Sequence, residues 1–225
     1  MHGLLNPDLF RQQAYVDGAW VDSEFTFPVL NPASGEVLGR VPDLAREEVA
    51  RAIAAAQAAL PGWRGRLAKE RADLLRRWHA LMLEHADDLA RLITLEQGKP
   101  LAEARGEVVY AAGFLEWFAE EARRVYGQVI PSPWPGRRVL TLKQPIGVAA
   151  LITPWNFPAA MLTRKAGAAL AAGCVVLAKP ASKTPFTALA LAKLAEAAGF
   201  PAGVVNVLTG NAETIGAELV ANPLV

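Results

Sequence analysis

One polar side chain stands in a stiff corner that follows an apolar stretch of the chain. Asn156 lies within residues 154–158 (PWNFP), directly after the apolar run at 147–153. Because the two prolines restrict the backbone, the Asn156 amide could be held as a hydrogen-bond donor to an oxyanion that develops during a reaction. From local features alone, the better interpretation is that Asn156 caps the helix that follows, since Asn is common at that position.

A second polar cluster follows another apolar run, at 175–178. Lys179 comes directly after this run, and Ser182 and Lys183 follow it closely. The Lys179 ammonium could contact the ribose or a phosphate of a nucleotide, although by itself an ordinary solvated lysine is the better interpretation. A hydroxyl, an ammonium and a helix that starts at Thr184 together predict a phosphate site, because the free N–H groups of a helix N-terminus attract anions.

Arg164 and Cys174 are two further residues whose types could do chemistry. Arg164 lies about two turns into a helix that is expected to begin at Pro158. Its guanidinium could clamp a carboxylate through two parallel hydrogen bonds, but an arginine there is usually a surface residue. Cys174, the only cysteine, stands at the start of an apolar run, where burial disfavours the thiolate. We therefore do not expect Cys174 to act as a nucleophile.

The elements that position these side chains alternate between apolar runs and helical periodicity. Strands are expected at 147–153, 175–178 and 204–208, and helices at 158–172, 184–198 and 213–220. This βαβαβα order predicts an α/β fold with an open parallel sheet. Ligands of such sheets bind just beyond the carboxyl ends of the strands, which is where the sequence places Asn156, Lys179 and Gly210.

The part of the chain before residue 146 has a different pattern. Short strands are expected within 15–40, followed by a helix from Arg46 that stops at Pro61-Gly62, a helical stripe over 67–97 with a joint near 86–88, a third helix over 101–126, and a β-type run at 139–143. No G-x-G-x-x-G or G-x-x-x-x-G-K-[ST] phosphate loop occurs in the sequence. A dinucleotide would therefore bind without the common glycine fingerprint.

Composition excludes several classes of function. Lys and Arg number 23 against 22 Asp and Glu, and hydrophobic residues make up 52% of the 225 residues. Balanced charge argues against a nucleic-acid partner, and the apolar content is enough to bury a core. The most apolar stretch, 146–160, is too short and too interrupted to cross a bilayer, and residues 1–20 do not resemble an export signal. One cysteine and three scattered histidines argue against a metal site. A single cysteine also excludes a disulfide framework, which favours a cytoplasmic location.

In several segments spread along nearly its whole length, the sequence resembles the NAD(P)-dependent aldehyde dehydrogenase family. The similar segments are 31–36 (NPASGE), 96–100 (EQGKP), 152–158 (ITPWNFP), 171–174 (AAGC), 179–185 (KPASKTP), 199–206 (GFPAGVVN) and 209–210 (TG). Residues 159–165 (AAMLTRK) most resemble succinate-semialdehyde dehydrogenases. The resemblance implies oxidation of an aldehyde, with succinate semialdehyde favoured, to the carboxylic acid by NAD(P)+.

The resemblance also implies roles for individual residues. Asn156 is expected to be the catalytic oxyanion donor, and Arg164 to bind the distal carboxylate of the substrate, with Phe157 and Met161 as walls of the substrate tunnel. Cofactor contacts are expected at Thr153, Pro154, Trp155, Asn156, Lys179, Pro180, Ala181, Ser182 and Gly210. A carboxylate at position 182 would repel a 2′-phosphate. Because Ser182 does not and Lys183 adds positive charge, NADP is favoured over NAD.

The same resemblance implies an organisation in three parts. Residues 1–127 supply N-terminal strands and helices of a cofactor domain, 128–145 supply bridging and oligomerisation strands, and 146–225 supply the βαβαβα part of a dinucleotide-binding domain. The family's nucleophilic Cys and general-base Glu belong to its second half. We therefore expect an N-terminal half that is inactive alone and that belongs to a homo-oligomer when full-length. The alternatives are a non-catalytic dinucleotide-binding or interaction fragment, and an aldehyde dehydrogenase for another aldehyde.

Overall fold

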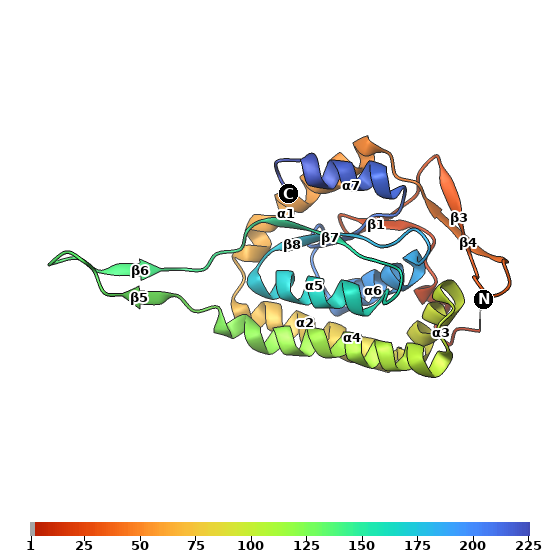
Figure 1. The fold of residues 1–225 in the computed structure, drawn as a ribbon, viewed down its shortest axis with the longest axis horizontal. Helices are drawn as coiled ribbons and strands as arrows, with labels where there is room; N and C mark the ends of the chain where they lie inside the picture. Colours follow the sequence, from red (N-terminus) through yellow and green to blue (C-terminus); the bar gives the residue numbers. More distant parts are fainter. Residues whose placement is uncertain (1–2) are drawn as a thin grey trace.

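The central element of the fold is a five-stranded sheet with the order β2-β1-β9-β8-β7. The computed structural model describes residues 3–225. Its parallel strands are β7 (Val148–Ile152), β8 (Val175–Lys179) and β9 (Val205–Val207). All five residues of β8 are buried, as expected for a strand covered on both faces. The predicted α/β fold with parallel βαβ units is confirmed (Figure 1).

The N-terminal strands extend this sheet, which the sequence pattern did not indicate. The hairpin of β1 (Ala14–Val16) and β2 (Ala19–Val21) joins β9 in antiparallel fashion, with Tyr15 opposite Val207. The Asp17 backbone N–H donates to the side-chain oxygen of Asn206 (2.9 Å). The Asn206 amide in turn donates to two backbone carbonyls. This buried asparagine therefore ties the first strands of the chain to β9.

Helices cover both faces of the sheet and add a further layer on one side (Figure 1). One face carries α1 (Arg46–Arg64) and α7 (Ala212–Ala221), the other face carries α5 (Ala160–Ala172) and α6 (Pro185–Ala198), and α2 (Ala68–Glu84), α3 (Ala86–Gln97) and α4 (Leu101–Glu121) pack on α5 and α6. Because α6 is enclosed between the sheet and this outer layer, almost all of its residues are buried. Polar groups at the ends of α5 and α6 must therefore find partners inside the protein.

Two predicted helix ends are wrong. The helix expected to stop at Pro61-Gly62 continues as α1 to Arg64, with Pro61 inside it. Trp63, in that last turn, is buried against Phe200, and this packing outweighs the hydrogen bond that proline cannot make. The helix expected over 101–126 ends as α4 at Glu121 and continues as a short 3-10 turn, Ala122–Arg124. The joint predicted near 86–88 is present between α2 and α3.

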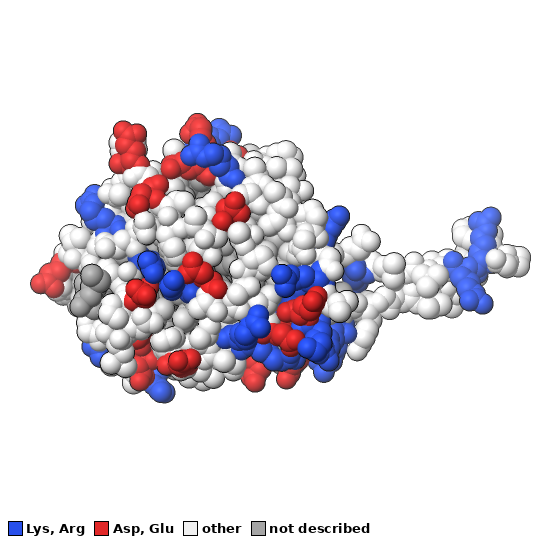
Figure 2. Space-filling model, turned by 180° about the vertical axis from the view of Figure 1, so that it is seen from behind, with Lys and Arg blue, Asp and Glu red and all other residues white. Residues whose placement is uncertain are grey.

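A hairpin of β5 (Gln128–Ile130) and β6 (Val139–Thr141) projects from the body as an arm (Figure 1). Its end carries basic residues, whereas acidic and basic residues mix over the body in the view of Figure 2. A separate two-stranded sheet, β3 (Thr26–Leu30) and β4 (Val37–Pro42), lies near the N-terminal end. No helix within residues 3–225 is both long and apolar enough to cross a membrane.

Candidate functional site

The carboxyl ends of β7 and β8 lie side by side. Ile152 stands opposite Lys179 in the parallel register, and the Thr153 backbone N–H donates to the Lys179 carbonyl (3.1 Å). Beyond this point the chain leaves the sheet as an exposed corner that includes Trp155 and Asn156. The two predicted clusters of polar residues therefore begin at adjacent strand ends, as expected for a parallel sheet.

Lys179 is buried, so the interpretation of Lys179 as an ordinary solvated residue is wrong. Its side chain is 2% exposed. The ammonium donates to the Pro180 carbonyl (2.7 Å) and lies 3.3 Å from the Ser182 hydroxyl oxygen. Ser182 donates to the Gly210 carbonyl (2.9 Å). Four residues with predicted cofactor contacts, from the ends of β8 and β9, are thus joined in one hydrogen-bonded group.

Asp43 is a member of this neighbourhood that the sequence analysis missed. Burial lowers the pKa of Lys179 to about 8, and the Asp43 carboxylate opposes that shift. Asp43 also accepts from the Asn211 N–H (2.8 Å), and Leu44 N–H donates to the Thr209 carbonyl (3.2 Å). The segment after β4 therefore shapes one side of the group. Nothing local to Asp43 in the sequence indicates this contact.

The N–H groups at the N-terminus of α6 are not free to contribute to the predicted phosphate site. The buried Glu96 carboxylate accepts from the N–H groups of Phe186 (2.7 Å) and Thr187 (2.8 Å), and also from the Thr187 hydroxyl. The donors that an anion would need are therefore already used by the protein itself. Burial raises the pKa of Glu96 to about 7, although these hydrogen bonds act in the opposite direction. A bound phosphate would have to contact Lys179 and Ser182 instead.

The helix α5 is capped in the same way, and the interpretation of Asn156 as its cap is wrong. Glu107, from α4, accepts from the N–H groups of Ala159 (2.9 Å) and Ala160 (3.2 Å). Glu107 is also a residue that the sequence analysis missed. Because a glutamate from another helix supplies the cap, Asn156 is not needed for that role. Within the described part of the chain its carboxamide makes no hydrogen bond, and the residue is exposed.

Arg164 and Met161, two of the predicted substrate residues, lie together on α5. An Arg164 guanidinium nitrogen is 4.0 Å from the Met161 sulfur. The guanidinium also stands 5.4 Å from the centre of the Phe114 ring on α4, a distance at which a cation is attracted to an aromatic face. The Arg164 side chain is exposed, so its charge can reach a ligand.

An aromatic face of α4 continues this region. A hollow of about 410 Å³ is lined by Tyr110, Gly113, Phe114, Trp117 and Phe118. A neighbouring hollow of about 210 Å³ shares Tyr110 and includes Phe157, the third predicted substrate residue. The spacing of Tyr110, Phe114 and Trp117 at intervals of one helical turn is the signal that could have revealed this face in the sequence.

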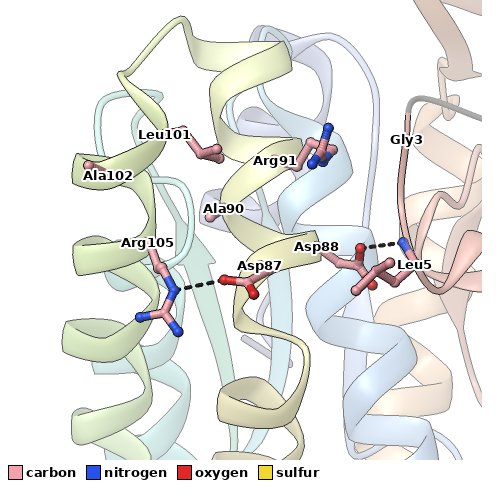
Figure 3. Close-up of a pocket in the computed structure, with 9 residues that line it drawn as sticks. All are labelled: Gly3, Leu5, Asp87, Asp88, Ala90, Arg91, Leu101, Ala102 and Arg105. Atoms are coloured by element: carbon pink, nitrogen blue, oxygen red, sulfur yellow. Dashed lines mark hydrogen bonds and ion pairs between the residues drawn. The ribbon is translucent and has the colours of Figure 1, made fainter.

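A hollow of larger volume lies elsewhere, among the N-terminal segment, α3 and the start of α4 (Figure 3). It has a volume of about 610 Å³, and none of the predicted site residues lines it. Within it, Asp88 accepts from the Leu5 N–H (2.7 Å), and Arg105 pairs with Asp87 (2.7 Å) (Figure 3). Its size therefore does not identify the site at the strand ends. Over residues 3–225 no group of three or more His, Cys, Asp or Glu side chains is arranged to hold a metal ion.

The sheet is open and its β7, β8 and β9 are parallel, helices cover both of its faces, and polar residues gather beyond adjacent strand ends, which is where α/β proteins of this type bind their ligands. The chain belongs to the aldehyde dehydrogenase family, whose profile matches residues 20–225.

Similar proteins include two curated bacterial enzymes and one crystal structure. Glutarate-semialdehyde dehydrogenase of Pseudomonas aeruginosa is 62% identical over 99% of this chain and 46% of its own length. Succinate-semialdehyde dehydrogenase [NADP(+)] GabD of Escherichia coli is 61% identical over 99% and 46%. An aldehyde dehydrogenase of Brucella melitensis superposes with a TM-score of 0.99 at 56% identity, over all of this chain and 47% of its own. The chain thus spans about half the length of the relatives it matches.

Proposed function

We propose that this chain is part of an enzyme that oxidises an aldehyde with a distal carboxylate to the dicarboxylic acid, with NAD(P)+ as the oxidant. The observation that carries the proposal is the adjacency of two strand ends, where the Thr153 N–H meets the Lys179 carbonyl (3.1 Å). The exposed Asn156 follows one of these ends, and the buried Lys179 ammonium terminates the other. Asn156 donates to the developing oxyanion, and Lys179 holds the cofactor.

Arg164 supports a carboxylated substrate. Its exposed guanidinium stands over Phe114, beside the aromatic face of α4, so it offers a fixed positive charge next to an apolar wall. An aldehyde with an apolar middle and a carboxylate at its far end matches that surface. Succinate semialdehyde is the favoured substrate, and the names of similar enzymes include both succinate and glutarate semialdehydes. An aldehyde of another kind is the alternative.

The residues around Lys179 fit an adenosine dinucleotide. When bound, NAD(P)+ supplies the acceptor for the hydride of the substrate. Lys179 and Ser182 supply a cation and a hydroxyl for the ribose and its phosphate. The backbone is closely packed at Gly210, where φ is +145° and an added Cβ would come within 2.9 Å of the Leu44 nitrogen. We favour NADP because Ser182 is uncharged, and the Escherichia coli relative is named for NADP(+).

Substitution of Ser182 tests the cofactor. In Ser182→Glu, the new carboxylate repels a 2′-phosphate and accepts hydrogen bonds from ribose hydroxyls. We expect the affinity of the chain for NADP, measured by calorimetric titration, to fall about tenfold or more, with a much smaller change for NAD. Ser182→Ala is the matched control: it removes the hydroxyl without adding a negative charge, so its loss of affinity for NADP should be much smaller than that of Ser182→Glu. Equal losses for NADP and NAD in Ser182→Glu would contradict the NADP proposal.

Measurement of turnover tests the function. The single thiol, Cys174, is buried, so the 225-residue protein is expected to form no NADPH from an aldehyde. The same chain joined to the second half of the Pseudomonas aeruginosa relative is expected to oxidise succinate and glutarate semialdehydes. It should prefer them over an uncharged aldehyde of the same length by about tenfold or more. Sustained turnover by the chain alone, or a folded hybrid without that preference, would refute the proposal.

Cofactor titration of the unmodified chain distinguishes the proposed function from its main alternative, a non-catalytic interaction fragment. A non-catalytic interaction fragment would release no heat with NADP or NAD, whereas the proposed cofactor site requires binding. Two further expectations from the sequence stay predictions, namely a cytoplasmic location and homo-oligomer formation by the full-length enzyme.

A further inference from the structure

A buried ion pair lies between α4 and the corner that carries Asn156. The Lys99 ammonium contacts the Glu107 carboxylate at 2.5 Å. The two side chains are 10% and 1% exposed. Lys99 stands just before α4 and Glu107 lies within it, so the pair belongs to one local segment of the chain. A buried ion pair is stable only when further polar groups compensate for the loss of hydration of its two charges.

Those further groups all belong to residues 156–160. The Lys99 ammonium donates to the Asn156 carbonyl (3.0 Å) and stands 4.0 Å from the centre of the Phe157 ring. The Glu107 carboxylate accepts from the N–H groups of Ala159 (2.9 Å) and Ala160 (3.2 Å). The pair therefore contacts every residue of this segment except Pro158. It fixes the segment at its first carbonyl and at its last two amides.

These contacts control the backbone of Asn156 and leave its side chain free. The Asn156 carbonyl accepts from Lys99, and the Phe157 ring packs against the same ammonium. The Ala159 N–H donates to Glu107. The carboxamide itself has no hydrogen-bond partner within residues 3–225. The pair therefore fixes the place at which the Asn156 side chain leaves the backbone, and an oxyanion donor that is placed before the reaction needs less reorganisation.

We propose that Lys99 and Glu107 are positioning residues that fix the backbone at Asn156 and so place its side chain at the end of β7, where an oxyanion donor is required. The inference rests on the proposed function, because that function gives Asn156 its role. The two residues touch neither substrate nor cofactor in this account. A simpler role, in which Glu107 only caps α5 and Lys99 only neutralises it, makes a different prediction for Asn156.

A double variant distinguishes the two roles. In Lys99→Met/Glu107→Gln, the glutamine carbonyl can still accept from Ala159 and Ala160, and no buried charge is left without a partner. The contact with the Asn156 carbonyl is lost. In NMR spectra of the 225-residue chain, we expect the backbone N–H signals of Asn156 and Phe157 to move to the positions of unstructured residues and to show increased mobility. Hydrogen exchange at Ala159 and Ala160 should change by less than about tenfold.

Three single variants complete the experiment. Lys99→Arg keeps a cation at the same place and should restore the Asn156 signals of the wild type. Lys99→Met leaves Glu107 without its cation, so it should lower the thermal midpoint in addition to releasing Asn156. Lys69→Met is the control, because it removes an exposed lysine that pairs with Asp73 and should leave Asn156 unchanged.

Two results would overturn the proposal. Asn156 signals that stay unchanged in the folded double variant would assign the pair to the helix cap alone. Loss of the folded spectrum in the double variant would show that the pair acts on the whole fold rather than on the corner. Neither measurement uses cofactor binding or turnover, so the inference and the proposed function fail separately.

Discussion

At the scale of single residues, burial shifts the pKa values of Lys179 and Glu96 in opposite directions. Lys179 is 2% exposed and its pKa falls to about 8, whereas Glu96 is 3% exposed and its pKa rises to about 7. In both, the loss of water disfavours the charged form. Lys179 nevertheless stays mostly protonated at neutral pH, so it can still attract a phosphate. Glu96 is not directed to a ligand, and its environment matters for stability instead.

Arg164 provides a prediction at this scale. In the hybrid enzyme described above, Arg164→Ala should raise KM for succinate semialdehyde by about ten- to a hundredfold, because a charge-assisted contact worth about 1.5–3 kcal/mol is lost. KM for an uncharged aldehyde should change little. Steady-state kinetics with both substrates measure the difference. Lys165→Ala is the control, since Lys165 donates to the Ile152 carbonyl. Equal changes for both substrates would remove Arg164 from the carboxylate site.

At the scale of elements, each helix that follows a parallel strand is capped by a side chain of the protein, which accepts hydrogen bonds from the first N–H groups of that helix. Glu107 caps α5 and Glu96 caps α6, and each glutamate comes from the outer helical layer. The third helix, α7, is capped by its own Asn211. Carboxylates are favourable at these positions because they meet free N–H groups and the positive end of the helix dipole. The cofactor proposal therefore relies on side chains beyond the strand ends rather than on these helix starts.

The Glu96 cap predicts a pH dependence of stability. Its pKa is about 7 in the folded chain against 4.5 as its ordinary value, so between these values the folded state binds more protons. The free energy of unfolding should therefore fall by about 3 kcal/mol as the pH rises from 4.5 through 7, and the Glu96 contribution should level off above about pH 8. Urea unfolding at several pH values measures this slope. Glu96→Gln cannot titrate and should lose it.

Glu103→Gln is the control for this measurement, because Glu103 is exposed on α4. This control should keep the wild-type slope. If the wild type and Glu96→Gln show the same slope, the titration of Glu96 does not contribute to it.

At the scale of the whole molecule, the β5–β6 arm stands apart from the body (Figure 1). Val129 and Leu140 lie opposite each other in its register and are 76% and 62% exposed. An exposed apolar pair on a two-stranded hairpin has unpaired strand edges beside it, and such edges favour pairing with another chain. The arm is therefore the surface on which we place the predicted homo-oligomer contacts.

Substitution in the arm tests this assignment. In the hybrid enzyme, Val129→Lys/Leu140→Lys should shift the assembly toward monomer in sedimentation experiments, because charge replaces the apolar pair. The thermal midpoint should change little, since the arm contributes little to the core. Gln128→Lys is the matched control, because neighbouring residues of a strand point to opposite faces. Self-association that persists unchanged in the double variant would move the contact away from the arm.

Several parts of the fold could be predicted from the sequence because they depend on local patterns. The apolar run at 175–178 and the periodic segment at 184–198 became β8 and α6 within a residue or so of the predicted ends. The predicted strand ends also indicated that Lys179, Ser182 and Gly210 lie close together. The addition of β1 and β2 to the sheet could not be predicted, since a three-residue strand carries almost no signal of its partner.

The sequence by itself determined the order of strands and helices and the polar residues that follow each strand, because side-chain periodicity and turn residues act over a few positions. Only the tertiary structure decided which side chains accept from the first N–H groups of α5 and α6, and which groups surround Lys179. Glu96 meets Phe186 across 90 positions of the chain, and Asp43 meets Asn211 across 168. Such hydrogen bonds depend on how distant helices and strands pack in three dimensions, and local preference does not encode that arrangement.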